Sequence, residues 1–164
     1  MHILLLTGPA AAGKNTISHA LAHKRQKCAV IDVDLIRWMY RHPHHAPWEG
    51  EEGLSQRQLG VENTCLLAVN FAKHNIDVII LDVLVNETAF LYKERLKKYA
   101  LRIVLLMPSY QEAQKRLTQR PHTLSEDEFN LVYKWQEDLT AFDDKIDNSL
   151  LSAEETAIKL NAMF

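Results

Sequence analysis

The 164-residue sequence predicts a single α/β domain over residues 1–164, a three-layer α/β/α sandwich in which helices cover both faces of a parallel sheet. Short apolar runs without polar alternation recur along the chain, which is typical of parallel strands buried on both faces. The segments between these runs carry helix-capping residues and apolar side chains at helical spacing. The predicted strands are Ile3 to Thr7, Cys28 to Val33, Val78 to Leu84, Leu101 to Met107 and a weaker run at Lys145 to Ile146.

Serine–glutamate pairs mark the starts of three predicted helices. In each pair the serine precedes the glutamate by three positions, so that the hydroxyl and the carboxylate can satisfy backbone donors of a first helical turn. Apolar side chains at helical spacing within 89–99 and 129–136 predict one stripe on each of two helices that packs against the sheet. The pairs are Ser109 with Glu112, Ser125 with Glu128, and Ser152 with Glu155.

Composition narrows the class of protein. Apolar residues make up 47% and charged residues 24% of a chain whose formal net charge is -2, which fits a globular domain and lacks the basic footprint of nucleic-acid binding. Cys28 and Cys65 stand in apolar stretches without metal-ligand spacing, which predicts buried thiols and a reducing compartment. The chain starts on a strand rather than a signal peptide and has no run of about 20 apolar residues. We therefore expect a cytoplasmic protein without membrane or nucleic-acid partners.

The strongest motif is a glycine-bounded loop that directly follows the first predicted strand and directly precedes a helical stretch. Its glycines allow the loop to curl with backbone N–H groups around a phosphate, and the helix adds its positive N-terminal dipole. Lys14 is expected to reach the β and γ phosphates of a nucleotide. A chance glycine turn is the alternative, which the combination of strand, loop, lysine and helix disfavours. The expected nucleotide contacts are Gly8, Ala10, Ala11, Ala12, Gly13, Lys14, Asn15 and Thr16.

The loop departs from the usual motif at one position that bears on magnesium. The residue after the lysine is normally Ser or Thr, whose hydroxyl binds Mg²⁺, but here it is Asn15. An amide oxygen is also a hard ligand, and Thr16 follows it. Asp82 ends an apolar strand, where an acid often holds magnesium-bound water, although a terminal aspartate can also serve nearby backbone. We predict magnesium contacts from Asn15, Thr16 and Asp82.

Acidic residues after the second predicted strand point to the reacting centre. Ligands bind beyond the carboxyl ends of strands in open α/β sheets. Phosphoryl transfer needs a carboxylate that orients the attacking hydroxyl, so Asp34 is the candidate base and Asp32 its support, toward the substrate or the metal. Arg37 is placed to hold an anionic acceptor. The alternative is that Asp34 only caps a helix running to Tyr40 and that Arg37 is a solvated charge.

Two arginines after the fourth predicted strand are candidates for a lid over the triphosphate. Arg116 and Arg120 are four residues apart, so they share one helix face, with Lys115 nearby. An ordinary basic helix face is the alternative.

The motifs together resemble the P-loop kinases of small molecules, which include chloramphenicol phosphotransferase, shikimate and gluconate kinases, and the zeta toxins. The most specific part after the phosphate loop is Ile31-Asp32-Val33-Asp34 followed by Arg37 and His42-Pro43, which is similar to the zeta-toxin segment. The resemblance implies a P-loop fold of the nucleotide-kinase type, strand order 2-3-1-4-5, and Asp34 as the catalytic base. It also implies catalytic lid arginines, here Arg116 and Arg120 within a lid region 110–124, and a nucleotide-side loop at 146–149 that includes Asn148.

The acceptor side of the sequence is less specific. Residues 41–53 form a polar segment, longer than most connections, before a helix that begins near Leu54, and we expect it to be an acceptor-side loop. Trp48 in this loop and Glu62 in the helix are candidate substrate contacts, beside Asp32 and Arg37. Three histidines in the loop lack a fourth ligand nearby and are constrained by a proline, which disfavours a metal cluster. They are His42, His44 and His45.

The predicted function is that of an ATP- and Mg²⁺-dependent phosphotransferase that moves the γ-phosphoryl group to a hydroxyl of a small molecule. Antibiotics, sugars, nucleosides and nucleotide sugars are the acceptor classes considered, and ATP against GTP and monomer against homodimer stay open. A nucleotide-dependent regulatory NTPase without an acceptor is one alternative. A 5′-hydroxyl polynucleotide kinase is another, which the acidic balance disfavours.

Overall fold

The computed structural model describes residues 1–119 and 124–163. Within them the chain forms a five-stranded sheet in the order β2-β3-β1-β4-β5, with parallel pairing between all neighbours. The predicted fold class and strand order are therefore confirmed. The strands are β1 (Ile3–Thr7), β2 (Cys28–Asp32), β3 (Asp77–Leu81), β4 (Leu101–Leu106) and β5 (Asp144–Ile146).

Strands β2 and β3 end earlier than their apolar runs, because aspartates redirect the chain. At the end of β2 the Asp32 carboxylate accepts the N–H of Asp34 at 3.0 Å, so the helix starts there and Val33 belongs to it. After β3 the Asp82 carboxylate accepts the N–H of Val83 at 2.7 Å, and residues 82–85 leave the sheet as a connection. Polar side chains can satisfy the backbone in place of a strand ladder in this way.

The described residues contain seven helices, none of which is long and apolar enough to cross a membrane. The capping boxes at Ser125 and Ser152 are confirmed, with bonds in both directions. Ser109 also caps its helix, but the capping box predicted there is incomplete, because the Glu112 carboxylate pairs with Arg116. The helices are α1 (Lys14–Ala22), α2 (Val33–Arg37), α3 (Gly50–Lys73), α4 (Asn86–Arg95), α5 (Tyr110–Thr118), α6 (Glu126–Glu137) and α7 (Ala153–Asn161).

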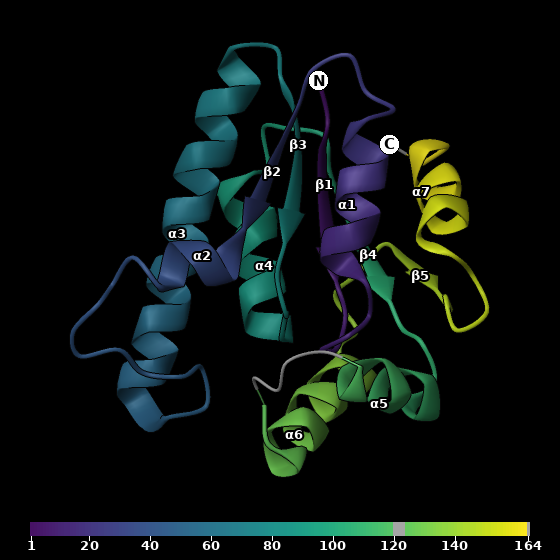
Figure 1. The fold of residues 1–164 in the computed structure, drawn as a ribbon. Coiled ribbons are helices and arrows are strands. Elements are labelled where there is room, and N and C mark those ends of the chain that lie inside the picture. Colours follow the sequence, from purple (N-terminus) through teal and green to yellow (C-terminus); the bar gives the residue numbers. More distant parts are fainter. Residues whose placement is uncertain (120–123, 164) are drawn as a thin grey trace.

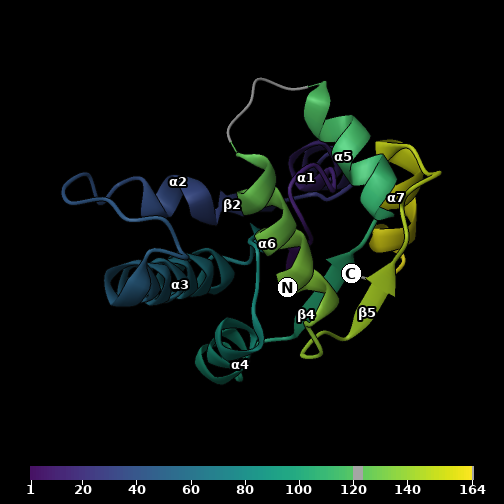
Figure 2. The ribbon, with the colours of Figure 1, turned by 90° about the horizontal axis from the view of Figure 1, so that it is seen from below.

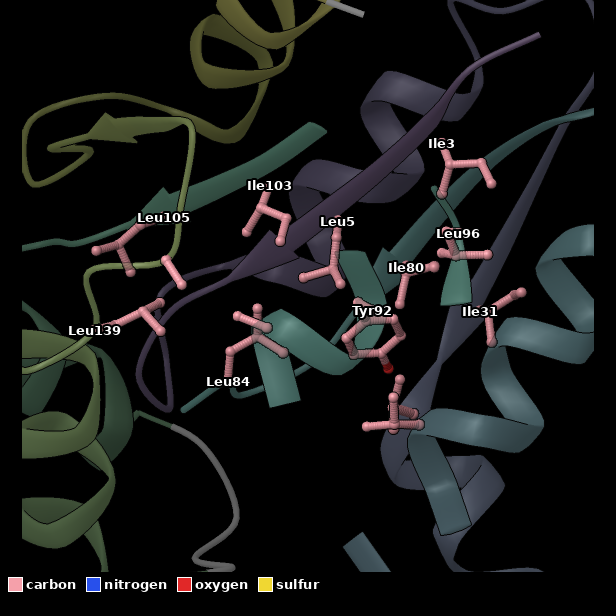
Figure 3. Close-up of a cluster of buried hydrophobic side chains, with 14 of the residues drawn as sticks. Ile3, Leu5, Ile31, Ile80, Leu84, Tyr92, Leu96, Ile103, Leu105 and Leu139 are labelled. Carbon is pink, nitrogen blue, oxygen red and sulfur yellow. The ribbon is translucent and has the colours of Figure 1, made fainter. Parts of the chain in front are cut away.

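Helices lie on both sides of the sheet, with α1 and α7 on one side and α3 and α4 on the other (Figure 1), and each side has its own cluster of buried apolar side chains. Because successive side chains of a strand point to opposite faces, Leu4 and Leu6 pack with Ile17 of α1 and Leu160 of α7. The other face packs against α3 and α4, and its buried side chains include Ile3, Leu5, Ile31, Ile80 and Tyr92 (Figure 3). Burial of all these side chains is the main source of stability and makes the sheet a rigid support for the loops at its ends.

Helices α5 and α6 lie beyond the carboxyl ends of the strands (Figures 1 and 2). A buried hydrogen-bond network connects α6 to the end of the sheet. Thr7 Oγ1 donates to Gln136 Oε1 at 2.7 Å, Gln136 Nε2 donates to the Leu84 carbonyl at 2.7 Å, and the Leu84 N–H donates to Thr7 Oγ1 at 3.0 Å. Helix α6 is therefore fixed against the same edge that carries the glycine loop.

Helix α3 begins at Gly50, four residues earlier than predicted, so part of the expected 41–53 loop is helical. The remaining loop is bound to α3 through Gln56, whose side chain accepts the N–H of His45 at 3.0 Å and donates to the Pro43 carbonyl at 2.8 Å. The loop also passes very close to Gly53, where a Cβ would lie 2.1 Å from the Ala46 carbonyl oxygen. Glycine is therefore required at this helix position for the loop to pack as it does.

Candidate active site

The glycine loop connects β1 to α1 at the carboxyl edge of the sheet, as predicted. Gly8 approaches β4 so closely that a Cβ would lie 2.3 Å from the Leu106 carbonyl oxygen, and Gly13 is left-handed, with φ 90°. Within the described part of the chain, no side chain caps α1, although its first-turn N–H groups lack partners inside the helix. An uncapped helix start behind a curled loop is suited to an anion such as a phosphate.

Alanine at Gly8 is expected to destabilise the protein by roughly 2–5 kcal/mol, from the clash with Leu106 and the strained backbone together. Gly50 is the matched control, because it has φ 60° but no atom within 4 Å of its added Cβ, so G50A should cost only about 1–2 kcal/mol. Chemical denaturation measures the free energy of unfolding of both variants. If G8A were no more costly than G50A, the close approach at Leu106 would be wrong.

Two side chains hold the carbonyl groups of the loop. Lys14 Nζ donates to the carbonyls of Gly8 at 2.7 Å and Pro9 at 3.1 Å. From the other side, Asn148 Nδ2 donates to the Ala12 carbonyl at 2.8 Å. The Asn148 side chain is buried, so the structure places this predicted nucleotide contact behind the loop. Bonds to the carbonyls fix the peptide planes and hence the directions of the N–H groups.

Asp32 connects the glycine loop to the predicted base. Its Oδ2 accepts a hydrogen bond from Asn15 Nδ2 at 2.9 Å, while its Oδ1 accepts the Asp34 N–H at 3.0 Å. The cap of α2 is therefore Asp32, and the alternative that gave this role to Asp34 was wrong, as was the expected helix end at Tyr40, because α2 ends at Arg37. A single carboxylate thus holds the start of α1 and the start of α2 together.

Asp34 and Arg37 lie one turn apart on α2 and form an ion pair. Arg37 Nη2 is 2.6 Å from Asp34 Oδ1, and the Asp34 side chain is 61% exposed whereas that of Arg37 is 17% exposed. The carboxylate is accessible to a ligand, and its free oxygen and the guanidinium both stay near the end of β2. The structure therefore connects Asn15, Asp32, Asp34 and Arg37 through side-chain and backbone contacts at the end of β2.

Asp82 is buried behind this group. Its oxygens accept the Tyr92 hydroxyl at 3.0 Å and the Val83 N–H at 2.7 Å. Burial raises the pKa of Asp82, and the positive charge of Arg37 partly opposes that shift. Figure 3 shows the Tyr92 ring inside the apolar cluster. The structure places Asp82 at the strand end where the sequence predicted it, but its contacts there are to protein groups.

Arg116 lies against the predicted nucleotide-side loop. Its Nη2 donates to the carbonyls of Asn148 at 2.9 Å and Ser149 at 3.1 Å, and its Nε donates to Glu112 at 2.9 Å. The guanidinium therefore connects α5 to residues 148–149 rather than reaching the glycine loop in this arrangement. The other predicted lid residue, Arg120, lies outside the described residues, as does the segment 120–123 of the expected lid region 110–124.

A cavity of about 650 Å³ opens between α3, α4 and α6, and the sequence analysis missed the residues that define it. Arg57 of α3 is only 6% exposed, and its guanidinium carbon lies over the Trp135 ring of α6, 4.6 Å from the ring centre. Burial lowers the pKa of Arg57, and attraction to Asp82 partly opposes that shift. The buried residues of α3 include positions 53, 56, 60, 61 and 64, which places Arg57 on the helix face that packs against the protein. A positive charge on a buried helix face was the sequence signal that could have identified this residue.

The other acceptor-side candidates are not all at this cavity. Trp48 lies beside it, with its ring 6.2 Å from that of Trp135. Glu62 is instead paired with Arg95 at 2.5 Å, near the far end of α4. His44 stacks on Trp38, and His45 lies 3.4 Å from Glu49. Among residues 1–119 and 124–163, no three His, Cys, Asp or Glu side chains gather closely enough to hold a metal ion.

The described side chains would supply only some of the ligands of a nucleotide-bound magnesium ion. The Asn15 Nδ2 group is occupied by Asp32, which leaves the Asn15 amide oxygen for other contacts, and Thr16 is exposed in the first turn of α1. Nucleotide-bound Mg²⁺ commonly takes few protein oxygens and keeps several waters and phosphate oxygens. Asn15 and Thr16, with Asp32 beside them, are therefore the groups here that would face such an ion.

The sequence matches no family model and no curated protein, but the fold has many solved counterparts. A sugar kinase from Janibacter sp. HTCC2649 is similar with a TM-score of 0.68 and 15% identity, over 99% of this chain and 91% of that one. A shikimate kinase from Bacteroides thetaiotaomicron has a TM-score of 0.67 and 19% identity, over 99% and 97%. The tunicamycin resistance protein of Deinococcus radiodurans has a TM-score of 0.66 and 16% identity, over 99% and 94%. The chain therefore has the P-loop fold found in shikimate kinases and other small-molecule kinases.

Proposed function

We propose that this protein is a phosphotransferase that moves the γ-phosphoryl group of Mg-ATP to a hydroxyl of a small acceptor. The observation that carries the proposal is the link from Asn15 through Asp32 to Asp34, because it holds an accessible carboxylate next to the uncapped start of α1. A phosphate-binding loop alone would also suit a regulatory NTPase. The adjacent carboxylate and arginine are needed only when an acceptor hydroxyl must be oriented.

The roles of the residues follow from their positions. The N–H groups at the start of α1 bind phosphate oxygens, and Lys14, now on the Gly8 and Pro9 carbonyls, moves to the β and γ phosphates. Magnesium, when bound, neutralises phosphate charge. Asp34 accepts the proton of the acceptor hydroxyl while the hydroxyl oxygen bonds to the γ-phosphorus and the bond to the ADP oxygen breaks. Arg37 holds Asp34 by its other oxygen.

The acceptor is proposed to enter the cavity between α3, α4 and α6. Arg57 in its wall lies one turn before Gly60 on α3, and a Cβ at Gly60 would lie 2.6 Å from the side chain of Arg37, the ion-pair partner of Asp34, so the cavity wall continues toward the group around Asp34. A volume of about 650 Å³ is within the usual range for ligand sites. The solved counterparts named for sugar and shikimate phosphorylation support an acceptor of small size with hydroxyl groups.

The proposal is tested by ADP formation with and without a panel of hydroxyl compounds: sugars, hydroxy acids, amino alcohols, nucleosides and hydroxylated antibiotics. We expect at least one compound to raise ADP formation well above basal hydrolysis, with a stoichiometric phosphate ester seen by phosphorus NMR. Hydrolysis that no compound stimulates would contradict the kinase and favour the regulatory NTPase. ADP formation stimulated only by RNA or DNA ends would favour the polynucleotide kinase.

A further inference from the structure

Arg57 is a buried charged side chain that forms no close ion pair within the described residues. Its Nε and Nη2 are buried and, within the described residues, make no hydrogen bond. The guanidinium carbon lies over the Trp135 ring, which attracts the positive charge but offers the N–H groups no oxygen or nitrogen acceptor. A buried guanidinium with unpaired donors is costly unless an anion pairs with it, and the cavity beside Arg57 gives an anionic ligand access to this side chain.

The nearby carboxylates do not serve Arg57. Asp82 is engaged by Tyr92 and Val83 through its two oxygens. Glu87 lines the same cavity, but no ion pair joins it to Arg57, nor to any other cation in the described parts of the chain. Because its carboxylate is exposed, Glu87 remains available for a ligand. The cavity therefore presents one charge of each sign without pairing them.

The rest of the cavity wall is mainly apolar. Leu54, Val85, Leu91 and the Trp135 ring line it, together with the uncharged polar residues Gln58 and Thr88. A neutral sugar would leave both charges without a partner, and a simple hydroxy acid would bring a second negative charge near Glu87. A molecule with a positive group, a negative group and an apolar body would match the two charged residues and the apolar side chains of the wall, and its hydroxyl groups would suit Gln58 and Thr88.

We propose that the acceptor is a zwitterion, with its anionic group on Arg57, a cationic amino group facing Glu87, and its hydroxyl directed to Asp34. This inference rests on the proposed function, because it names the acceptor class of the same site. It excludes neutral sugars and simple hydroxy acids as the preferred acceptors. The negative charge of Glu87 then repels acceptors that carry only a negative charge, although Arg57 by itself would bind them.

The test uses two matched series of probes that differ only in charge. One series is tyrosine, 3-(4-hydroxyphenyl)propanoate and tyramine, and the other is homoserine, 4-hydroxybutyrate and 3-aminopropan-1-ol. Binding to the full chain is measured by titration calorimetry and by tryptophan fluorescence, both without nucleotide. We expect the zwitterion of at least one series to bind about tenfold more tightly than both single-charge members.

Variants of Glu87 and Arg57 test which part of the ligand each of the two charged side chains binds. Glu87→Gln should reduce the preference for the zwitterion over the hydroxy acid to less than about twofold, whereas Glu94→Gln, on the same helix but outside the cavity, should leave it intact. Arg57→Met should lose affinity for both anionic probes while the melting temperature stays the same or rises, because an unpaired buried charge is removed. A lower melting temperature with unchanged affinity would assign Arg57 a structural role only.

The outcomes separate this inference from the proposed function. Equal or tighter binding of the hydroxy acid, no charge preference, or no binding of any probe up to its solubility limit would overturn the zwitterion. Phosphorylation of a neutral sugar would also overturn it while leaving the kinase in place. Charge-selective binding with no phosphoryl transfer would instead retain the zwitterion site and contradict the kinase.

Discussion

Lys14→Met should lower nucleotide affinity by about 10–100-fold and acceptor-dependent turnover by about 10³-fold or more. The ammonium group is the cation placed inside the loop, where it now satisfies the carbonyls of Gly8 and Pro9. Phosphate binding replaces these two neutral acceptors by charged ones, so the stabilisation grows as charge develops on the transferred group. Methionine keeps the length of the side chain but removes the charge.

Titration calorimetry with ADP and a non-hydrolysable ATP analogue measures the affinity, and ADP formation measures the turnover. Lys98→Met is a matched control, because Lys98 is exposed and lies after α4. Thermal unfolding of both variants checks that the loop bonds of Lys14 are not essential for folding. Nucleotide affinity that Lys14→Met leaves unchanged would show that the loop does not bind a polyphosphate.

Asp34→Asn should lower acceptor-dependent turnover by about 10²–10⁴-fold while leaving nucleotide affinity within about twofold of wild type. Asparagine has the same shape and retains an oxygen for Arg37, but it cannot take up the proton of the hydroxyl. The Asp34 side chain is mostly exposed and is not a cap, since Asp32 fills that role, so stability should change little. Loss of turnover without loss of binding or stability is the signature of a base.

The measurement is steady-state turnover with the best acceptor of the panel, together with calorimetry of ADP binding. Asp127→Asn is the control, because Asp127 is an exposed acid in the first turn of α6. Full turnover in Asp34→Asn would remove Asp34 from the mechanism. A proportional loss of nucleotide affinity would instead assign it to nucleotide or metal binding.

The sequence was sufficient for most of the fold because its signals there are local. Continuous apolar runs predict buried parallel strands, and all five occur in the structure, with the sheet order that the resemblance implied. Ser125 and Ser152 cap their helices with residues three positions away, so neighbours in the chain decide the outcome. The glycine loop is also local, since its function depends on consecutive backbone N–H groups between one strand and one helix.

The predictions were wrong where a polar side chain had other hydrogen-bonding partners besides the one that the local sequence suggested. Glu112 was expected to complete a capping box with Ser109, but its carboxylate pairs with Arg116, which also contacts the loop after β5. Asp34 was the only residue considered as the cap of this helix, but Asp32 caps it, and the Asp32 carboxylate also accepts a hydrogen bond from Asn15 across the edge of the sheet. Hydrogen-bonding groups with several possible partners are assigned by the fold.

The sequence by itself determined the α/β class, the strand runs, and the place and chemistry of the glycine loop, because apolar periodicity and capping act over a few residues. Only the tertiary structure decided how the acceptor side is built. Arg57 and Trp135 are far apart in the chain, and their contact exists only because α3 and α6 meet at the end of the sheet. Whether a charge is paired, buried or open to a ligand depends on the low-dielectric surroundings that the folded chain creates, and those surroundings are not encoded by neighbouring residues.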